Sequence, residues 1–166
     1  MFKEGHAGLS FILFSPFLLL FESLGIDMNY ILVTCFLMVG LSSLPDLDIQ
    51  WEIKHRGITH TFLFGIIIGI LFAVLIGYAY GAIGWLMGFI AGFGGTASHL
   101  LGDAFTYTPL KPFTPFSDKE VGALGFFRSD NKAVNRTVLV LGVFVFVFSY
   151  QPSVVLDIIG SFMSMI

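Results

Sequence analysis

The chain has 166 residues, of which 56% are hydrophobic and only 11% are charged, and its formal net charge is −3. A soluble domain needs a solvated polar surface that this composition does not supply, so a soluble globular protein is excluded. The sequence predicts one integral membrane domain over residues 1–166, of the all-α class, built as a polytopic bundle of about five transmembrane helices.

Five apolar stretches have about the length at which a helix spans the hydrocarbon of a bilayer, roughly 17–25 residues. In chain order they cover residues 9–24, 30–44, 61–80, 82–101 and 133–150. Lys3 precedes the first stretch as in a signal peptide, but no small-residue cleavage motif follows, so we expect the stretch to be retained. The last residues, 151–166, include Pro152 and Asp157, and we expect an interfacial or re-entrant segment or a tilted partial span.

The basic residues set the orientation of these spans. With five crossings, all eight fall on the side of the N-terminus, and Lys and Arg are retained on the cytoplasmic side of a membrane. We therefore place the N-terminus and the loop of residues 105–132 in the cytoplasm. These residues are Lys3, Lys54, Arg56, Lys111, Lys119, Arg128, Lys132 and Arg136.

Four short polar clusters interrupt the apolar stretches, and the alternation of crossings brings all four to the cytoplasmic side. Together they contain every histidine of the chain, and imidazole and carboxylate groups are ligands that divalent metal ions accept. Cys35, the only cysteine, lies inside the second stretch, so no thiolate cluster can form. The clusters are Gly5-His6, Pro45-Asp46-Leu47-Asp48, His55-Arg56-Gly57-Ile58-Thr59-His60 and His99-Leu100-Leu101-Gly102-Asp103.

Two of the clusters carry carboxylates at informative spacings. Pro45 stops the second helix, and an extended Asp46 and Asp48 could give one carboxylate to a metal while the other binds a second ion or orients a histidine. His99 and Asp103, four residues apart, share one face of the fourth helix near its cytoplasmic end. A row of glycines on the same face would allow close helix packing.

The other two clusters place histidines at helix starts. We expect His6 just before the first helix, and His55 and His60 on either side of the start of the third, which Thr59 could cap. Taken singly, each cluster also fits a solvated terminus, an interfacial loop or a structural hydrogen-bonded pair. Ionisable groups beside lipid are costly and usually functional, so their gathering on one side favours a metal site.

These motifs together resemble the YdjM-like membrane-bound metal-dependent hydrolases. That family's pattern is an N-terminal Gly-His, Pro-Asp-x-Asp after the second helix, His-Arg-Gly-x-Thr-His and His-x-x-x-Asp, and the match continues through Thr106, Pro109, Pro112 and Pro115. The chain is more remotely similar to the zinc phospholipase C and single-strand-specific nuclease superfamily, which has further downstream histidines and a terminal amine near its metals. In this chain no histidine follows His99, and five residues precede His6.

The resemblance implies an enzyme of the inner membrane that hydrolyses phosphoesters with divalent metal ions. Zinc is favoured over manganese or iron, and two ions are expected, because two ions can clamp the phosphoryl oxygens. Asp48 or His55 would be the base, and Arg56 would clamp the phosphate, although it could equally be a positive-inside anchor. The metal ligands would be His6, Asp46, His60, His99 and Asp103, with Asp48 and His55 as ligands or as the base.

The loop of residues 105–132 is rich in Pro and Phe and lies on the side of the clusters. It could be an interfacial lid that guides a lipid head group inward, with Phe113, Phe116, Phe126 and Phe127 in the membrane and Arg128 near the phosphate, or a plain connector. We expect membrane lipids and a phosphoester or lipid substrate as partners, and no nucleic acid.

Other functions compete with hydrolysis. A metal transporter would hold its ligands near the bilayer midplane, whereas these clusters lie at one edge. A haem protein could use His60 and His99 as axial ligands, but three carboxylates beside them argue against it. A metal that is only structural is a further alternative, since an open coordination position is a matter of geometry.

Overall fold

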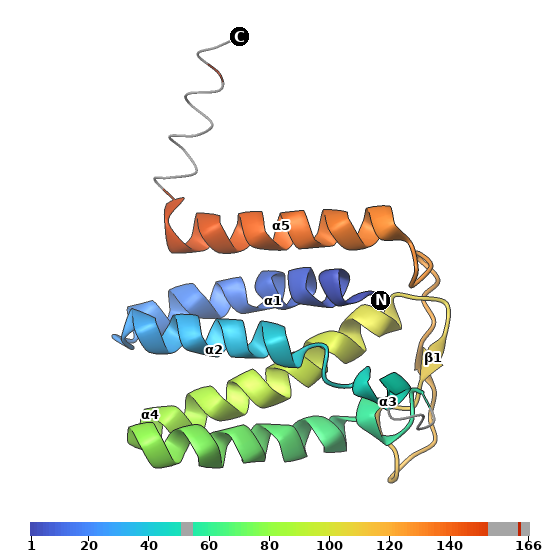
Figure 1. Ribbon diagram of the computed structural model, residues 1–166, viewed down its shortest axis with the longest axis horizontal. Helices are drawn as coiled ribbons and strands as arrows, with labels where there is room; N and C mark the ends of the chain where they lie inside the picture. Colours follow the sequence, from blue (N-terminus) through green and yellow to red (C-terminus); the bar gives the residue numbers. More distant parts are fainter. Residues whose placement is uncertain (51–54, 153–162, 164–166) are drawn as a thin grey trace.

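The computed structural model describes residues 1–50, 55–152 and 163, and most of its helices lie side by side (Figure 1). Helices dominate, so the all-α class is confirmed. The expected terminal segment, residues 151–166, falls almost entirely outside the described residues. The elements are α1 (Lys3–Ser23), α2 (Met28–Leu41), α3 (Leu47–Gln50), the 3-10 helix η1 (Ile58–His60), α4 (Phe62–Ala104), β1 (Pro109–Leu110), β2 (Val121–Gly122) and α5 (Lys132–Tyr150).

Helices α1, α4 and α5 are long and apolar enough to cross a membrane, and α2 is a shorter apolar helix. Two of the five predicted spans lie within α4, which reverses direction at Gly81 and forms two antiparallel arms (Figure 1). Gly81 has φ 66° and ψ −149°, a conformation that a residue without a Cβ adopts readily. The chain therefore turns back with almost no loop.

The two arms of α4 pack at backbone contact because glycines line the second arm. A Cβ on Gly84 would lie 2.5 Å from the Ile76 carbonyl oxygen, and one on Gly88 would lie 2.3 Å from that of Phe72. Gly92 follows the same pattern one turn further on. This row leads along α4 toward His99, as the sequence predicts.

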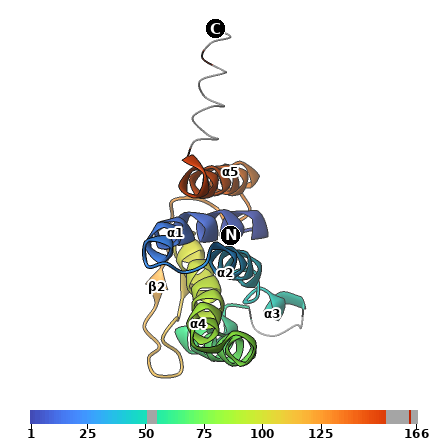
Figure 2. The ribbon, with the colours of Figure 1, turned by 90° about the vertical axis from the view of Figure 1, so that its left-hand side faces the viewer.

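Helix α5 packs along α1, on the side away from most of α4 (Figure 2). A Cβ on Gly142 would lie 2.2 Å from the Gly8 carbonyl oxygen, so these two backbones touch. An apolar core that includes Phe14, Ile31 and Met87 joins α1, α2 and α4. Exposed apolar side chains cover the outer faces, as expected of helices in lipid.

Helix α1 begins at Lys3, six residues before the apolar stretch that predicted it, so His6 lies inside the helix and not before it. Backbone hydrogen bonding continues beyond the apolar part of a span, because the interface accepts polar side chains. Glu4 in the first turn also suits the helix dipole. The helix thus holds His6 in a fixed orientation.

Candidate metal centre

One end of the bundle gathers nearly all of the buried charged and imidazole groups. These groups come from four segments: α1 carries His6, the turn into α3 and its first residues carry Asp46 and Asp48, the segment that enters α4 carries His55 and His60, and the end of α4 carries His99 and Asp103. Three overlapping groups of these side chains could hold a metal ion: His6, Asp46 and His99; Asp46, His55 and His60; and His60, His99 and Asp103. Asp48 contacts both His55 and His60, so the structure brings all seven predicted residues together.

Four donor atoms lie close together at the centre, two imidazole nitrogens and one oxygen from each of two carboxylates. The Nε2 atoms of His60 and His99 are 3.1 Å apart. Asp46 Oδ1 lies 3.6 and 3.5 Å from them, and Asp103 Oδ2 lies 3.8 Å from each. Tetrahedral zinc with bonds of 2.0–2.1 Å separates its ligand atoms by roughly 3.3 Å. His60 Nε2, His99 Nε2 and Asp103 Oδ2 therefore fit a single divalent ion with shifts of a few tenths of an ångström, and Asp46 Oδ1 approaches the same two nitrogens.

The hydrogen bonds behind these two imidazoles decide which nitrogen carries the proton. His99 Nδ1 lies 2.7 Å from the Ser42 carbonyl oxygen, which can only accept. The Thr59 hydroxyl donates to Asp48 at 3.0 Å and so accepts from His60 Nδ1. In its neutral form each ring consequently turns an unprotonated Nε2 toward the other, which is the arrangement of metal-binding histidines.

His6 borders this set and is fully buried. Its ring stacks on His99 at a centroid distance of 3.8 Å, and its Nε2 lies 3.1 Å from the Met1 carbonyl oxygen and 3.6 Å from Asp103 Oδ1. Its Nδ1 has no hydrogen-bond partner among the residues that the structure describes. A buried polar atom without a partner is costly, and a metal ligand is one explanation for it.

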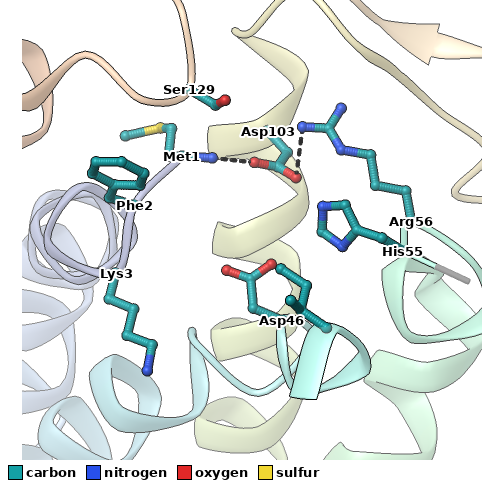
Figure 3. Close-up of a pocket in the computed structure, with 9 residues that line it drawn as sticks. Met1, Phe2, Lys3, Asp46, His55, Arg56, Asp103 and Ser129 are labelled. Atoms are coloured by element: carbon teal, nitrogen blue, oxygen red, sulfur yellow. Dashed lines mark hydrogen bonds and ion pairs between the residues drawn. The ribbon is translucent and has the colours of Figure 1, made fainter. Parts of the chain in front are cut away.

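The Met1 amino group forms an ion pair with Asp103 Oδ1 (Figure 3). The other oxygen of the same carboxylate belongs to the four-atom set. Asp103 thus presents one oxygen to each of two neighbouring cation positions. The five residues that precede His6 in the sequence did not predict this contact.

Asp48 is fully buried and lies behind the metal-facing groups. It accepts hydrogen bonds from His55 Nδ1 at 3.0 Å, from the Arg56 backbone N–H at 3.2 Å and from Thr59. Burial alone would raise the pKa of Asp48, but the bonds from His55 and Thr59 and the nearby His60 outweigh it and hold that pKa below its usual value. The Asp48 carboxylate is therefore placed to orient both histidines.

The cap of α4 differs from the one predicted. Thr61, not Thr59, accepts a hydrogen bond from the Phe64 backbone N–H. The 3-10 turn of η1 inserts one turn before the helix, so Thr59 is left free to bind Asp48.

Arg56 joins the cluster to the segment after α4. Its φ is 60°, in the left-handed region that costs a non-glycine residue energy. Its Nη2 lies 3.2 Å from Asp103 Oδ2, and its Nη1 donates to the Thr108 carbonyl oxygen at 2.5 Å. Only 12% of its side chain is exposed, which an anchor in the head-group region would not require. The guanidinium therefore faces the cluster.

A pocket of about 340 Å³ opens onto the cluster. Its charged and polar wall includes Arg56, Asp103 and His55, whose side chain is 44% exposed (Figure 3). Phe2 and Ile49, respectively 40% and 59% exposed, form an apolar part of the lining. The complete lining is Met1, Phe2, Lys3, Asp46, Ile49, His55, Arg56, Asp103 and Ser129.

The segment between α4 and α5, residues 105–131, contains the short antiparallel pair β1–β2, which the sequence did not predict. Phe113 packs on the first residue of α4, whereas Phe116 and Phe126 are 83% and 71% exposed. Arg128 pairs with Asp130 in an exposed position and does not line the pocket.

Asn135 is a buried polar residue near the start of α5 that sequence reasoning passed over. Its signal was present, since an amide near the start of an otherwise apolar span needs a partner.

Comparison with known proteins identifies a family. The family model described as YdjM inner membrane protein matches residues 1–164, nearly the whole chain. No curated protein and no solved structure matches the chain significantly.

Proposed function

The chain belongs to the YdjM inner membrane protein family, and on that premise we propose that it is a metal-dependent hydrolase that cleaves a phosphoester. The closeness of the paired nitrogens His60 Nε2 and His99 Nε2 to one oxygen each of Asp46 and Asp103 supports this proposal most directly. Apolar packing holds the bundle together, and it does not require four buried or half-buried metal-ligand atoms from three separate segments to lie side by side.

The donor set favours zinc, since mixed imidazole and carboxylate ligands suit that ion. The four central residues would hold the first ion. A second would be held by His6 with Asp46, or by Asp46 with His55. When bound, such ions lower the pKa of a water molecule and draw charge from phosphoryl oxygens.

Arg56 is the residue that we assign to the phosphate. A guanidinium can donate two parallel hydrogen bonds to phosphate oxygens, and this one lines the pocket beside Asp103. Its two nitrogen contacts, to Asp103 and to the Thr108 carbonyl, fix the guanidinium at the edge of the cluster before a substrate enters.

His55 is the residue that we assign to proton transfer. Its Nδ1 is bonded to Asp48, which fixes the orientation of the ring. Its side chain is partly exposed at the pocket, so its Nε2 can take a proton from water or give one to a leaving group. Asp48 would act as a positioning residue, because it is buried away from the pocket.

A lipid is the substrate class that the pocket suits best. Exposed Phe2 and Ile49 lie beside charged groups in one lining, so both an anionic head and the start of an apolar tail find complementary surface. Lys3, at the start of α1, adds a cation at the membrane boundary, where lysine side chains place their ammonium in water. The basic residues of α1, the α4 entry and α5 favour the cytoplasmic leaflet.

Metal content and hydrolysis, measured on the same detergent-purified protein, test this function. We expect bound zinc and zinc-dependent release of phosphate or alcohol from a panel of soluble and lipid phosphoesters. Both should be lost in His99→Ala and kept in Ser98→Ala, a neighbouring buried polar residue outside the donor set. Bound zinc without hydrolysis of any phosphoester would instead favour a transporter or a structural metal site, and a parent protein that binds no metal would refute the proposal.

A further inference from the structure

We propose that Asn135 of α5 is a positioning residue that holds His6 in the metal centre from outside it. The inference rests on the proposed metal centre and adds a residue that belongs to none of the four polar clusters. It explains why a helix without a metal ligand packs so closely on the start of α1.

The amide of Asn135 is 1% exposed and makes three hydrogen bonds. Its Oδ1 accepts from the Phe2 backbone N–H at 2.9 Å. Its Nδ2 donates to the carbonyl oxygens of Ser129 at 3.0 Å and Asn131 at 2.8 Å. The side chain thus ties α1 to the pocket wall, because Ser129 lines the pocket.

Gly5 and Asn135 are complementary in shape. A Cβ on Gly5 would lie 2.2 Å from Asn135 Oδ1, so the amide reaches Phe2 only because residue 5 has no side chain. This contact gives a physical reason for a glycine directly before the histidine of the first cluster.

The amide is connected to His6 through the first turn of α1. The Phe2 carbonyl oxygen accepts from the backbone N–H groups of Gly5 at 3.0 Å and of His6 at 3.2 Å. The carbonyl oxygen of Met1, the residue before Phe2, lies 3.1 Å from His6 Nε2. Fixing Phe2 therefore fixes both the backbone that carries His6 and the oxygen that orients its ring.

The test replaces the amide with an apolar side chain of similar size, Asn135→Leu, in the full-length protein in detergent. We expect zinc affinity, titrated against a chromophoric chelator, to fall about 10–100-fold, the usual effect of removing a group that orients a metal ligand. Asn131→Ala is the matched control, because it removes the side-chain cap of α5 and leaves the link to Phe2 in place.

A double-mutant cycle separates positioning from general destabilisation. If Asn135 acts through His6, Asn135→Leu should weaken zinc binding no further in a His6→Ala background. Gly5→Ala places a Cβ against the Asn135 amide and should reproduce the loss of zinc affinity. It replaces Asn135→Leu in the test if that variant does not fold. Unchanged affinity in Asn135→Leu or in that substitute, an equal loss in Asn131→Ala, or additive losses in the cycle would overturn the proposal. A parent protein without zinc would overturn the metal centre itself, so the two failures are distinguishable.

Discussion

The Nε2 atoms of His60 and His99 face each other across 3.1 Å, although the residues are 39 positions apart in the chain. His60 donates its Nδ1 proton to Thr59, and His99 donates its Nδ1 proton to the Ser42 carbonyl oxygen. The two Nε2 atoms therefore direct lone pairs at each other. Both rings are fully buried, so bulk water does not hydrate these lone pairs. The pair is therefore poorly satisfied until a cation joins it.

Metal removal is expected to destabilise the fold for this reason. Zinc that binds only the folded protein adds about 2.7 kcal/mol of stability when its free concentration is 100 times the dissociation constant. Thermal unfolding in detergent, with excess zinc and with a chelator, measures the shift. The double variant His60→Ala with His99→Ala should show no zinc-dependent shift, and an equal shift in it would place the stabilising zinc elsewhere.

Hydropathy predicted where the long helices lie, but it did not predict how they are connected or where they begin. The apolar stretches locate all the long helices, because composition decides whether a segment can lie in lipid. The direct reversal at Gly81 depends on one φ angle that any glycine can adopt, and the sequence offers nineteen glycines. Helix α1 begins before its apolar stretch, because hydropathy detects the apolar part of a helix and not its hydrogen-bonded end.

The membership of the polar cluster also followed from the sequence, whereas the division of roles within it did not. Asp46 and Asp48 are two residues apart and chemically identical, and only the turn into α3 directs one toward the donor set and the other behind His60. The contact of the Met1 amino group with Asp103 depends on how α1 packs against the end of α4, which no local pattern encodes.

Replacing His55 should distinguish a role in proton transfer from a role as a metal ligand. If it transfers protons, His55→Gln is expected to lower kcat for a phosphoester by about 10²–10⁴-fold and to leave zinc content unchanged. Steady-state kinetics and elemental analysis of the same preparation give both quantities. Loss of a zinc ion in step with activity would identify His55 as a ligand instead.

Arg56→Lys should distinguish a phosphate clamp from a membrane anchor. Lysine keeps the charge but not the planar pair of donors, so we expect KM to rise at least tenfold, about 1.4 kcal/mol, if Arg56 binds the phosphate. Arg128→Lys is the matched control, because Arg128 is an exposed cation paired with Asp130 and away from the pocket. An unchanged KM in Arg56→Lys would favour the anchor.

The contact between Gly8 and Gly142 predicts a strong position-dependent effect of a single methyl group. Gly142→Ala would place a Cβ 2.2 Å from the Gly8 carbonyl oxygen, and because both atoms belong to helix backbones, α5 must move away from α1. We expect a loss of roughly 1–3 kcal/mol of stability, typical of overpacking, and weaker zinc binding because α5 carries the contact to Phe2. Gly40→Ala is the control, since its Cβ would meet no atom within 4 Å and alanine favours the helix. Chemical unfolding of the two variants in one detergent compares them, and equal stabilities would mean that α1 and α5 are not in backbone contact.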